Sequence, residues 1–382
     1  MANVSSSNGL EKRPKLRFPG FDKPWKVFKA EELFQNITDK NHPDETVLTI
    51  IQGKGTLPRE QAGRNIHYDD ASLSNYKKVE QGDFIIHLRS FEGGLEMANE
   101  AGIVSPAYTI LRCKRPHSSL FYDAYFHTDE FINHNLSKSV EGIRDGRQIS
   151  YEAFKWLGIP YCEPTEQEKI SNLFAALNER IAKQRDLIEA LKKYKRGAVA
   201  HILSGKSVAF AVTSSWTEHT LSELCSEFRS GRNISATLIH QTGNFPVYGG
   251  NGIRGYCNQY SHDGEYVVVG RQGALCGNVR LIQGKNYLSE HAIAVQANEA
   301  NETKFLLYLL DYMKLGQYSD QGAQPGLAVN KLLRLKCMVP DKQTQIKIAS
   351  FLMSFDFQIS TQERMLMLLN CQRRALLQQL FI

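Results

Sequence analysis

The sequence predicts an α+β protein in which two globular α/β-mixed domains alternate with two long helices. The helices pack on each other as an antiparallel coiled coil. Three observations lead to this fold class. Residues 164–203 recur 178 residues downstream as residues 342–381. Both segments place apolar residues at the 4-3 spacing of a coiled coil, and the stretch before each one contains a tryptophan-led start. One ancestral unit used twice, giving a pseudo-two-fold internal repeat, accounts for all three.

The two helical segments share some residues and, more closely, their chemistry. A glutamine and a cation interrupt both apolar seams at the same places, Gln184 and Lys195 in one and Gln362 and Arg373 in the other. Two unrelated core helices would not match in this way. At about 1.5 Å per residue each helix would be roughly 60 Å long. The predicted seam residues are Ile170, Phe174, Leu177, Ile181, Ile188 and Leu191 in the first helix, and Ile348, Leu352, Phe355, Ile359, Leu366 and Leu369 in the second.

Capping residues mark the ends of these helices. Thr165 with Glu168 forms a capping box, and Asp341 is the N-cap expected for the second helix. Gly205 is an ordinary C-terminal cap of the first helix. The stretch AHILSGKS (200–207) resembles a phosphate-binding loop, but it begins with alanine and follows a helix instead of a strand. It therefore predicts a helix stop.

These limits divide the chain into five segments. They are an N-terminal tail (1–14), a first globular domain (15–160), a central spacer helix (161–206), a second globular domain (207–338) and a C-terminal spacer helix (339–382). Strand-like stretches follow acidic turns at GDFIIHLR (82–89) and DGEYVVVGR (263–271), and TKFLLYLLDYM (303–313) is helical in character. Both globular domains are therefore expected to mix strands with short helices.

Composition and charge describe an ordinary globular protein. The 382 residues are 42% hydrophobic and 23% charged, with a net charge of +6 and a pI near 8.8. This basic balance permits a nucleic-acid partner without requiring one. Seven scattered cysteines without a C-x-x-C pair indicate a reducing compartment. There is no apolar run of membrane-spanning length, and the first residues lack the apolar core of a signal peptide. We expect a cytoplasmic protein.

The sequence contains no recognisable catalytic constellation. It lacks an intact phosphate loop, an Asn-Pro-Pro-aromatic methyltransferase motif and a His/Cys/carboxylate cluster with metal-ligand spacing. Glu166 and Glu168 are charges at a helix start and do not form an acid–base pair. We therefore expect this chain to catalyse nothing and to bind no metal.

Two divergent heads on a rigid spacer form a ruler that fixes the distance between two recognised targets. In this arrangement the chain resembles, over nearly its whole length, the specificity (S) subunits of type I DNA restriction–modification systems. The resemblance is carried by the two Gln-x-Lys-Ile helices (167–203 and 345–381) and by the tryptophan-led starts of both heads. The stretches YGGNGIRGY (248–256), VVVGRQGALCG (267–277) and QGAQPGLAVNKLLRLKCMVP (321–340) add to it.

The resemblance implies that each head is a target-recognition domain that reads one half of a bipartite, asymmetric site in double-stranded DNA. The paired helices would set the gap and dock two methyltransferase (M) subunits, which bring S-adenosylmethionine and methylate adenine. Motor–nuclease (R) subunits with ATP and Mg would join for cleavage, so no cofactor is expected in this chain. Two alternatives stay open: a two-headed scaffold that binds proteins and no DNA, and a specificity module of a related DNA modification enzyme.

The stretch YGGNGIRGY spells G-x-G-x-x-G at Gly250, Gly252 and Gly255. A dinucleotide site would need a strand before this motif and a helix after it. A strand is possible at NFPVY (244–248), but the residues that follow lack helical spacing. In a DNA-reading head, the glycines would instead let loops turn sharply and approach the DNA closely.

Candidate DNA contacts are loop side chains that suit base edges or phosphates. Solvated loop charges are the alternative at every such position, and most real contacts should go to phosphate. The basic clusters KKYKR (192–196) and QRR (372–374), with the apolar helix ends AVAHIL (198–203) and ALLQQLF (375–381), form a second, hypothetical surface for partner subunits. The candidate DNA contacts are Lys54, Arg59, Arg64, Arg89, Arg144 and Arg147 in the first head, and Asn251, Arg254, Arg271, Gln272, Gln321 and Gln324 in the second.

Overall fold

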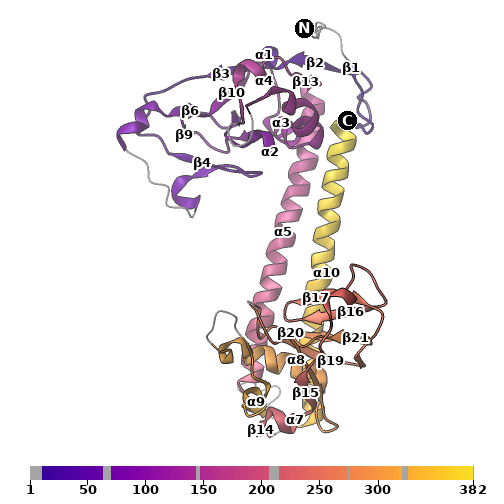
Figure 1. Ribbon diagram of the computed structural model, residues 1–382. Coiled ribbons are helices and arrows are strands. Elements are labelled where there is room, and N and C mark those ends of the chain that lie inside the picture. Colours follow the sequence, from indigo (N-terminus) through magenta and orange to yellow (C-terminus); the bar gives the residue numbers. More distant parts are fainter. Residues whose placement is uncertain are drawn as a thin grey trace. The chain divides into compact units, whose positions relative to one another are not determined.

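The computed structural model describes residues 11–62, 70–142, 147–205, 215–273, 275–320 and 326–381, and the chain divides into two compact units (Figure 1). Unit 1 comprises Met1–Gln184 and Met365–Ile382, and unit 2 comprises Arg185–Arg364. Each unit therefore holds one globular part and about half of each long helix. The limits of the five segments expected from the sequence remain predictions.

Two helices of 40 residues each, α5 (Pro164–Leu203) and α10 (Lys342–Phe381), contribute to both units. In unit 1, Phe174 near the start of α5 shares a core with Phe381 at the end of α10. In unit 2, Ile202 near the end of α5 shares a core with Leu352 near the start of α10. The helices therefore pair antiparallel in each unit, which confirms this part of the predicted fold class (Figure 1).

The apolar seam lies where the helices face each other. Ten of the twelve predicted seam residues are buried, and Leu191 and Leu366 are half-buried. The cations that interrupt the seam have polar partners on the other helix. Lys195 binds Asp356 at 2.5 Å in unit 2, and Arg373 donates to Asn178 at 2.8 Å in unit 1. Because both positions of one pair lie 178 residues from those of the other, the repeat extends to these bonds.

The structure corrects one predicted cap and bears out two others. Helix α5 begins at Pro164, and the main-chain N–H groups of Glu166 and Gln167 donate to the carbonyl of Glu163. Thr165 therefore lies inside the first turn, because proline at the first helical position already fixes the start one residue earlier. Asp341 accepts from the N–H of Thr344 at 3.1 Å, as expected of an N-cap. Gly205, at φ +72°, follows the end of α5.

Unit 1 is built on a four-stranded antiparallel sheet with strand order β3-β10-β7-β8. Its core is aromatic and includes Trp25, Phe34, Phe121 and Tyr122. The strands of unit 1 are β1 (Glu11–Lys12), β2 (Trp25–Lys29), β3 (Phe34–Ile37), β4 (Leu48–Ile51), β5 (Gly55–Pro58), β6 (Lys77–Val79), β7 (Phe84–Ile86), β8 (Glu96–Met97), β9 (Gly102–Val104), β10 (Thr109–Cys113), β11 (Val140–Glu141), β12 (Gln148–Ile149) and β13 (Gly158–Tyr161). Its short helices are α1 (Ala30–Leu33), α2 (Ser90–Gly93), α3 (Ser119–Phe126) and α4 (Tyr151–Phe154).

Unit 2 repeats this plan with different residues. Its main sheet has the strand order β15-β22-β19-β20, also antiparallel throughout. Its strands are β14 (Thr217–Thr220), β15 (Cys225–Ser230), β16 (Phe245–Gly249), β17 (Gly252–Cys257), β18 (His262–Asp263), β19 (Tyr266–Gly270), β20 (Val279–Ile282), β21 (Lys285–Leu288), β22 (Ala292–Ala297) and β23 (Lys336–Val339). Its short helices are α7 (Leu221–Leu224), α8 (Thr303–Tyr312) and α9 (Val329–Leu332).

The order of elements confirms the internal repeat. Strand, four-residue helix and strand follow one another as β2-α1-β3 in unit 1 and as β14-α7-β15 in unit 2. The first strand of each set pairs antiparallel with the strand that precedes the long helix, β13 or β23. The two stretches predicted to be equivalent strands, within 82–89 and 263–271, become β7 and β19 and occupy the same place in their sheets.

The glutamine shared by the two helices has the same role in both units. Gln167 accepts from the N–H of Ser118, just before α3, and donates to the carbonyl of Cys162. Gln345 accepts from the N–H of Glu302, just before α8, and donates to the carbonyl of Pro340. Both side chains are buried, so each satisfies polar groups that water does not reach. The identity seen in the sequence thus ties a helix of each globular part to its own long helix.

The units differ in what they add to the common sheet. Unit 1 adds the antiparallel pairs β4–β5 and β6–β9. Unit 2 adds a second sheet of strand order β17-β16-β21-β18. Three of the candidate recognition residues, Lys54, Asn251 and Arg254, lie in these additions.

Candidate nucleic-acid interface

The glycine-rich stretch of unit 2 is a β-hairpin, formed by β16 and β17. Strand β17 begins within the motif and continues past it, where a dinucleotide site needs a helix, which agrees with the sequence-based rejection of such a site. The glycines are required by packing within the chain. A Cβ atom on Gly250 would lie 2.4 Å from the carbonyl oxygen of Gln272, and one on Gly255 would lie 2.6 Å from that of His240. These two glycines thus make room for neighbouring main chain, and their role in close approach to DNA stays a prediction.

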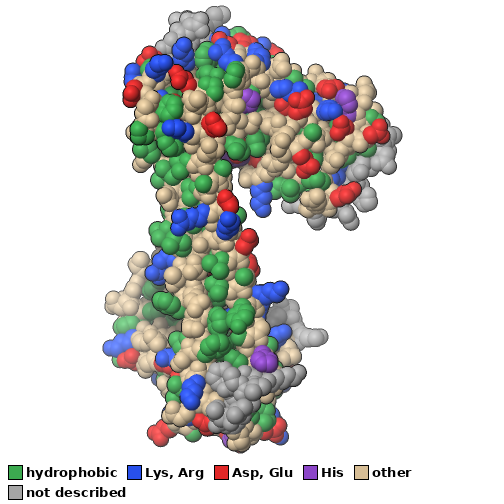
Figure 2. All heavy atoms as spheres, turned by 180° about the vertical axis from the view of Figure 1, so that it is seen from behind, with side chains coloured by type: hydrophobic (Ala, Val, Ile, Leu, Met, Phe, Trp, Pro, Cys, Tyr) green, Lys and Arg blue, Asp and Glu red, His purple; other side chains and the backbone are tan. Residues whose placement is uncertain are grey.

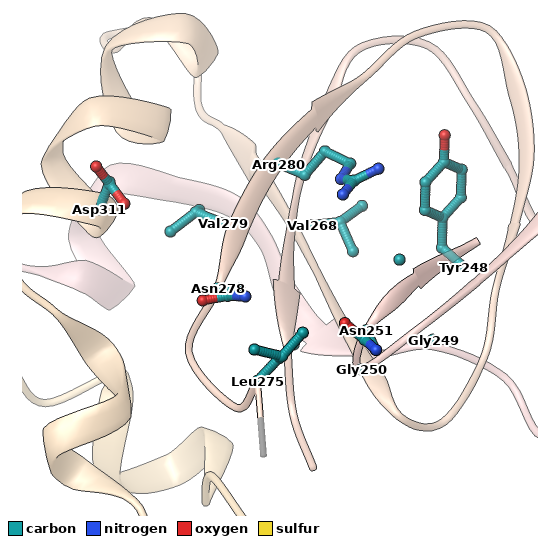
Figure 3. A pocket seen from close by; sticks show the side chains of 12 residues that line it. Tyr248, Gly249, Gly250, Asn251, Val268, Leu275, Asn278, Val279, Arg280 and Asp311 are labelled. Carbon is teal, nitrogen blue, oxygen red and sulfur yellow. The ribbon is translucent and has the colours of Figure 1, made fainter. Parts of the chain in front are cut away.

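A hollow of about 220 Å³ opens beside this hairpin (Figure 3). Tyr248, Asn251 and the hairpin glycines line one part of it, and Asn278 and Arg280 line another. The amide groups can donate to and accept from base edges, and the guanidinium suits a phosphate or a guanine edge. Asp311 also lines the hollow and adds one negative charge to it.

The predicted residues of unit 2 fall into two groups. Asn251 and Arg254 are exposed on the hairpin, with the side chain of Arg254 packed across Gly249. Arg271 is half-buried and donates to the main-chain carbonyls of Leu327 and Glu290. Gln272 is bonded to His291 at 2.5 Å. The hairpin residues are therefore available to a ligand, whereas Arg271 and Gln272 already hold the local structure together.

In unit 1 three of the predicted cations lie around the short helix α2. Lys54 is at the tip of the β4–β5 hairpin, Arg89 directly precedes α2, and the guanidinium of Arg147 lies 4.3 Å from the ring centre of Phe91 in α2. The hairpin tip lies against α2, because a Cβ atom on Gly93 would fall 2.1 Å from the side-chain nitrogen of Gln52. We call this surface, made of Lys54, Arg89 and Arg147, the α2 corner.

The remaining predicted residues are not part of either surface as described. Arg59 lies at the other end of the β4–β5 pair, with its guanidinium 5.9 Å from the ring centre of Tyr76. Arg64, Arg144, Gln321 and Gln324 lie outside the described residues.

Two residues near these surfaces were missed from the sequence. Arg280 is exposed on β20, and its guanidinium lies beside Gly252 of the hairpin. Gln52 is exposed next to Lys54 on the unit 1 hairpin. The sequence search favoured charged loop residues, so an arginine within a strand carried no signal. A glutamine before Gly53 offered only the weak signal of a turn.

The apolar helix ends proposed as partner-docking sites are buried within their own units, so that hypothesis is wrong for the apolar side chains. Val199, Ile202 and Leu203 belong to the core of unit 2. Leu377, Leu380 and Phe381 belong to the core of unit 1.

Helix α10 instead exposes other large apolar side chains, notably Phe357 at 73%, Met367 at 69% and Leu368 at 59%. Hydrophobic side chains are visible on the surface of the long helices in Figure 2.

A larger cavity of about 530 Å³ lies in unit 1 near the start of α5. Its charges neutralise one another. Glu166 accepts two hydrogen bonds from Arg17, at 2.9 and 2.7 Å, and a third from the indole N–H of Trp25. This glutamate is therefore a structural ion-pair partner, and the cavity lacks the positive excess that would attract DNA.

Within the described ranges, no set of three or more His, Cys, Asp or Glu side chains is grouped to hold a metal ion. In the same parts of the chain, no helix combines the length and apolar character needed to cross a membrane.

Replacing Arg280 by alanine is expected to weaken binding of duplex DNA roughly three- to tenfold and to reduce the slope of log K against log salt by about one, because one phosphate contact is lost. Titration of labelled duplex at several salt concentrations measures both. Arg229→Ala is the matched control. Arg229 lies on β15, at the opposite edge of the same sheet, and is paired with Glu227 at 2.7 Å. An equal loss of affinity in the control would show that Arg280 makes no specific contribution to DNA binding.

Part of the chain is similar in sequence to known specificity subunits. Residues 213–367 match the family model described as type I restriction modification DNA specificity domain. The chain is 45% identical over 141 residues to the type I restriction enzyme EcoprrI specificity subunit of Escherichia coli, covering 36% of this chain and 35% of that protein. It is 28% identical over 141 residues to the putative type I specificity subunit S.MpnORF285P of Mycoplasma pneumoniae, covering 35% and 46%. The matched segments span less than half the length of these relatives. The matches confirm the resemblance to type I specificity subunits that was inferred from the sequence.

Solved structures share the fold over nearly the whole chain. The type I restriction–modification S subunit from M. genitalium has a TM-score of 0.64 at 18% identity, covering 97% of this chain and 99% of that one. The HsdS subunit from Thermoanaerobacter tengcongensis has a TM-score of 0.51 at 17% identity, covering 97% and 98%. At these identities the likeness is one of fold.

Proposed function

We propose that this chain is a DNA specificity subunit of a type I restriction–modification enzyme. Each globular part reads one half of a bipartite, asymmetric site, and the antiparallel helices set the gap between the halves. The chain works in the cytoplasm and catalyses nothing itself. Methyltransferase subunits supply S-adenosylmethionine, and motor–nuclease subunits supply ATP hydrolysis with Mg.

The observation that carries this proposal is the duplication of one sheet with two different additions. The strand orders β3-β10-β7-β8 and β15-β22-β19-β20 are equivalent. Both units therefore carry their added hairpins on the same framework. The hairpins added to that framework differ in length and residues. A common scaffold with divergent loops is what two different half-sites require, because recognition residues are commonly held on loops of a rigid fold.

The two candidate surfaces support DNA as the ligand. The α2 corner of unit 1 collects three cations, and the glycine hairpin of unit 2 collects Arg254, Arg280 and Asn251 beside a hollow. Lysine and arginine suit phosphates, and asparagine can pair with adenine in the major groove. Each of these residues remains a proposed contact, as do Arg59, Arg64, Arg144, Arg271, Gln272, Gln321 and Gln324.

Exposed apolar side chains on α10 support a protein partner along the long helices. Phe357, Met367 and Leu368 leave large hydrophobic surfaces in water, and such surfaces commonly mark protein interfaces. We propose two methyltransferase subunits as the partners that cover the long helices. The buried helix ends, AVAHIL and ALLQQLF, have no part in this docking surface.

The decisive experiment expresses this chain with the methyltransferase encoded beside it and maps methylated adenines in host DNA. The proposal expects a bipartite motif with a fixed gap, which disappears when this chain is deleted. A motif that survives the deletion would leave the chain as a two-headed protein scaffold. A continuous motif that depends on the chain would favour a specificity module of a related modification enzyme.

A further inference from the structure

The tip of the β4–β5 hairpin in unit 1 is held by five hydrogen bonds to two residues outside the hairpin. Both oxygens of the Glu96 carboxylate accept main-chain N–H groups, from Gly53 at 2.6 Å and from Gly55 at 2.9 Å. These two amides flank Lys54 on either side. One carboxylate therefore fixes the main chain before and after a single exposed lysine.

A second side chain holds the same segment through its carbonyl groups. The amide nitrogen of Asn99 donates to the carbonyl of Lys54 at 2.8 Å and to that of Thr56 at 2.9 Å. Its main-chain N–H donates to the hydroxyl of Thr56 at 3.0 Å. We call Glu96 and Asn99 together the hairpin clamp. Since Glu96 lies in β8 and Asn99 just after it, the clamp belongs to the common sheet and holds an added hairpin.

Holding the hairpin in this way carries an energetic cost. Glu96 is fully buried, and a buried carboxylate is unfavourable unless it is well hydrogen-bonded. Burial raises the pKa of the Glu96 carboxyl, but hydrogen bonds from His127 and from the Gly53 and Gly55 amides outweigh it, so the pKa lies below its usual value. The group stays ionised and remains a strong acceptor.

Of the residues that the clamp holds, Gly55 and Thr56 are buried, whereas the residues just before them face solvent. Gln52, Gly53 and Lys54 are all exposed, and in the described part of the chain Lys54 has no ion pair or hydrogen bond through its ammonium group. The clamp therefore fixes the main chain that carries a solvent-facing lysine. Arg89 and Arg147 of the α2 corner lie next to α2, against which the hairpin tip packs through Gln52.

We infer that Glu96 and Asn99 are positioning residues that present Lys54 to a DNA phosphate in the first half-site. The inference rests on the proposed function and adds residues that do not themselves touch DNA. A lysine on a fixed main chain loses less conformational freedom on binding than one on a mobile loop, so its contact is stronger. Releasing the hairpin tip should remove the advantage of Lys54 while leaving its charge in place.

The test is a double-mutant cycle of Asn99→Asp and Lys54→Ala, in the complex with methyltransferase subunits. Asn99→Asp keeps the size of the side chain but sets a carboxylate against the two carbonyls that the amide held. We expect each single variant to weaken binding of the recognised duplex roughly three- to tenfold. We expect the double variant to bind within about twofold of Asn99→Asp alone, because Lys54 contributes only when it is positioned. Asn36→Asp adds the same charge at an exposed position of β3, at the opposite edge of the sheet, and is the control.

Losses that multiply in the double variant, or a single variant at either position that binds like the wild type, would overturn the inference. Glu96→Gln provides a second route, since it keeps the volume but turns an amide donor toward a main-chain N–H. It should show the same dependence on Lys54, and independent effects would again contradict the clamp. Failure of the proposed function is distinguishable, because then the wild-type complex itself would show no salt-dependent binding of the duplex.

Discussion

Replacing Phe381 by alanine is expected to lower the free energy of unfolding of unit 1 by about 3–5 kcal/mol, the range observed when a large buried aromatic is truncated. Phe381 is fully buried at the end of α10. Its ring lies 5.2 Å from that of Phe121 and 6.0 Å from that of Trp25, and it stacks on Phe174 of α5 at 6.3 Å. The last turn of the chain thus joins the globular part of unit 1 to both long helices. Denaturant unfolding monitored by tryptophan fluorescence measures the change.

Leu368→Ala is the matched control, because this leucine lies in the same helix and the same unit but is 59% exposed. It should change the free energy of unfolding by less than about 0.5 kcal/mol. A Phe381 variant that unfolds like the control would contradict the packing of the helix end. The contrast also guides experiments on partners. Deleting residues 375–382 would disrupt unit 1, so loss of a partner after such a truncation would not identify a docking surface. Substitution of Phe357, Met367 and Leu368 tests docking without removing core residues.

The long helices could be predicted from the sequence because their evidence is local and repeated. The 4-3 spacing from Ile170 to Leu191 depends only on the period of a helix, and the second copy at Ile348 to Leu369 repeats it independently. The repeat also gave the equivalence of β7 and β19, since both follow acidic turns. The strand pairings could not be predicted in the same way, because they join residues far apart in the chain, such as Val27 with Pro160.

The errors have physical causes of the same kind. Leu377, Leu380 and Phe381 form an apolar helix end, and the sequence does not state whether such an end is covered by its own domain or by another subunit. The cap was placed on Thr165 because its spacing to Glu168 fits a capping box, but Pro164 starts the helix earlier. A packing reason for glycine at position 250, the carbonyl of Gln272, could not be foreseen either, because only the folded chain brings the two together.

The candidate site was the least predictable part. Arginine and lysine in loops are common on any surface, and only packing distinguishes Arg271, bonded to two carbonyls, from Arg254, which is exposed. The hairpin clamp was invisible in the sequence for a related reason. Glu96 and Gly53 are 43 residues apart, and nothing in either segment indicates that one binds the other. Long-range polar contacts of this kind carry no periodic signal.

Lengthening both long helices by four residues is expected to lengthen the gap of the recognised site by about two base pairs while leaving both half-sites unchanged. Four helical residues add about 6 Å, and two base pairs span about 6.8 Å at roughly 3.4 Å each. Insertion between Gln184 and Arg185 in α5, and between Arg364 and Met365 in α10, falls at the limits of the two units and leaves the globular part of each unit with its own neighbours. Because the proposed contacts lie within single units, the half-sites should be read as before. Sequencing of methylated adenines in cells that express the variant measures the gap directly.

Two controls separate a change of length from a general disturbance. Two inserted residues in each helix turn the seam by about 200°, so the apolar faces no longer meet, and methylation should be lost. Four residues are close to one full turn and keep the faces nearly aligned. Insertion of four residues into α5 alone leaves the helices unequal and should also abolish methylation. A doubly lengthened variant that methylates sites with the original gap would refute the role of the helices as the ruler. If the gap instead moves with the helices, then their length determines which pairs of half-sites are recognised.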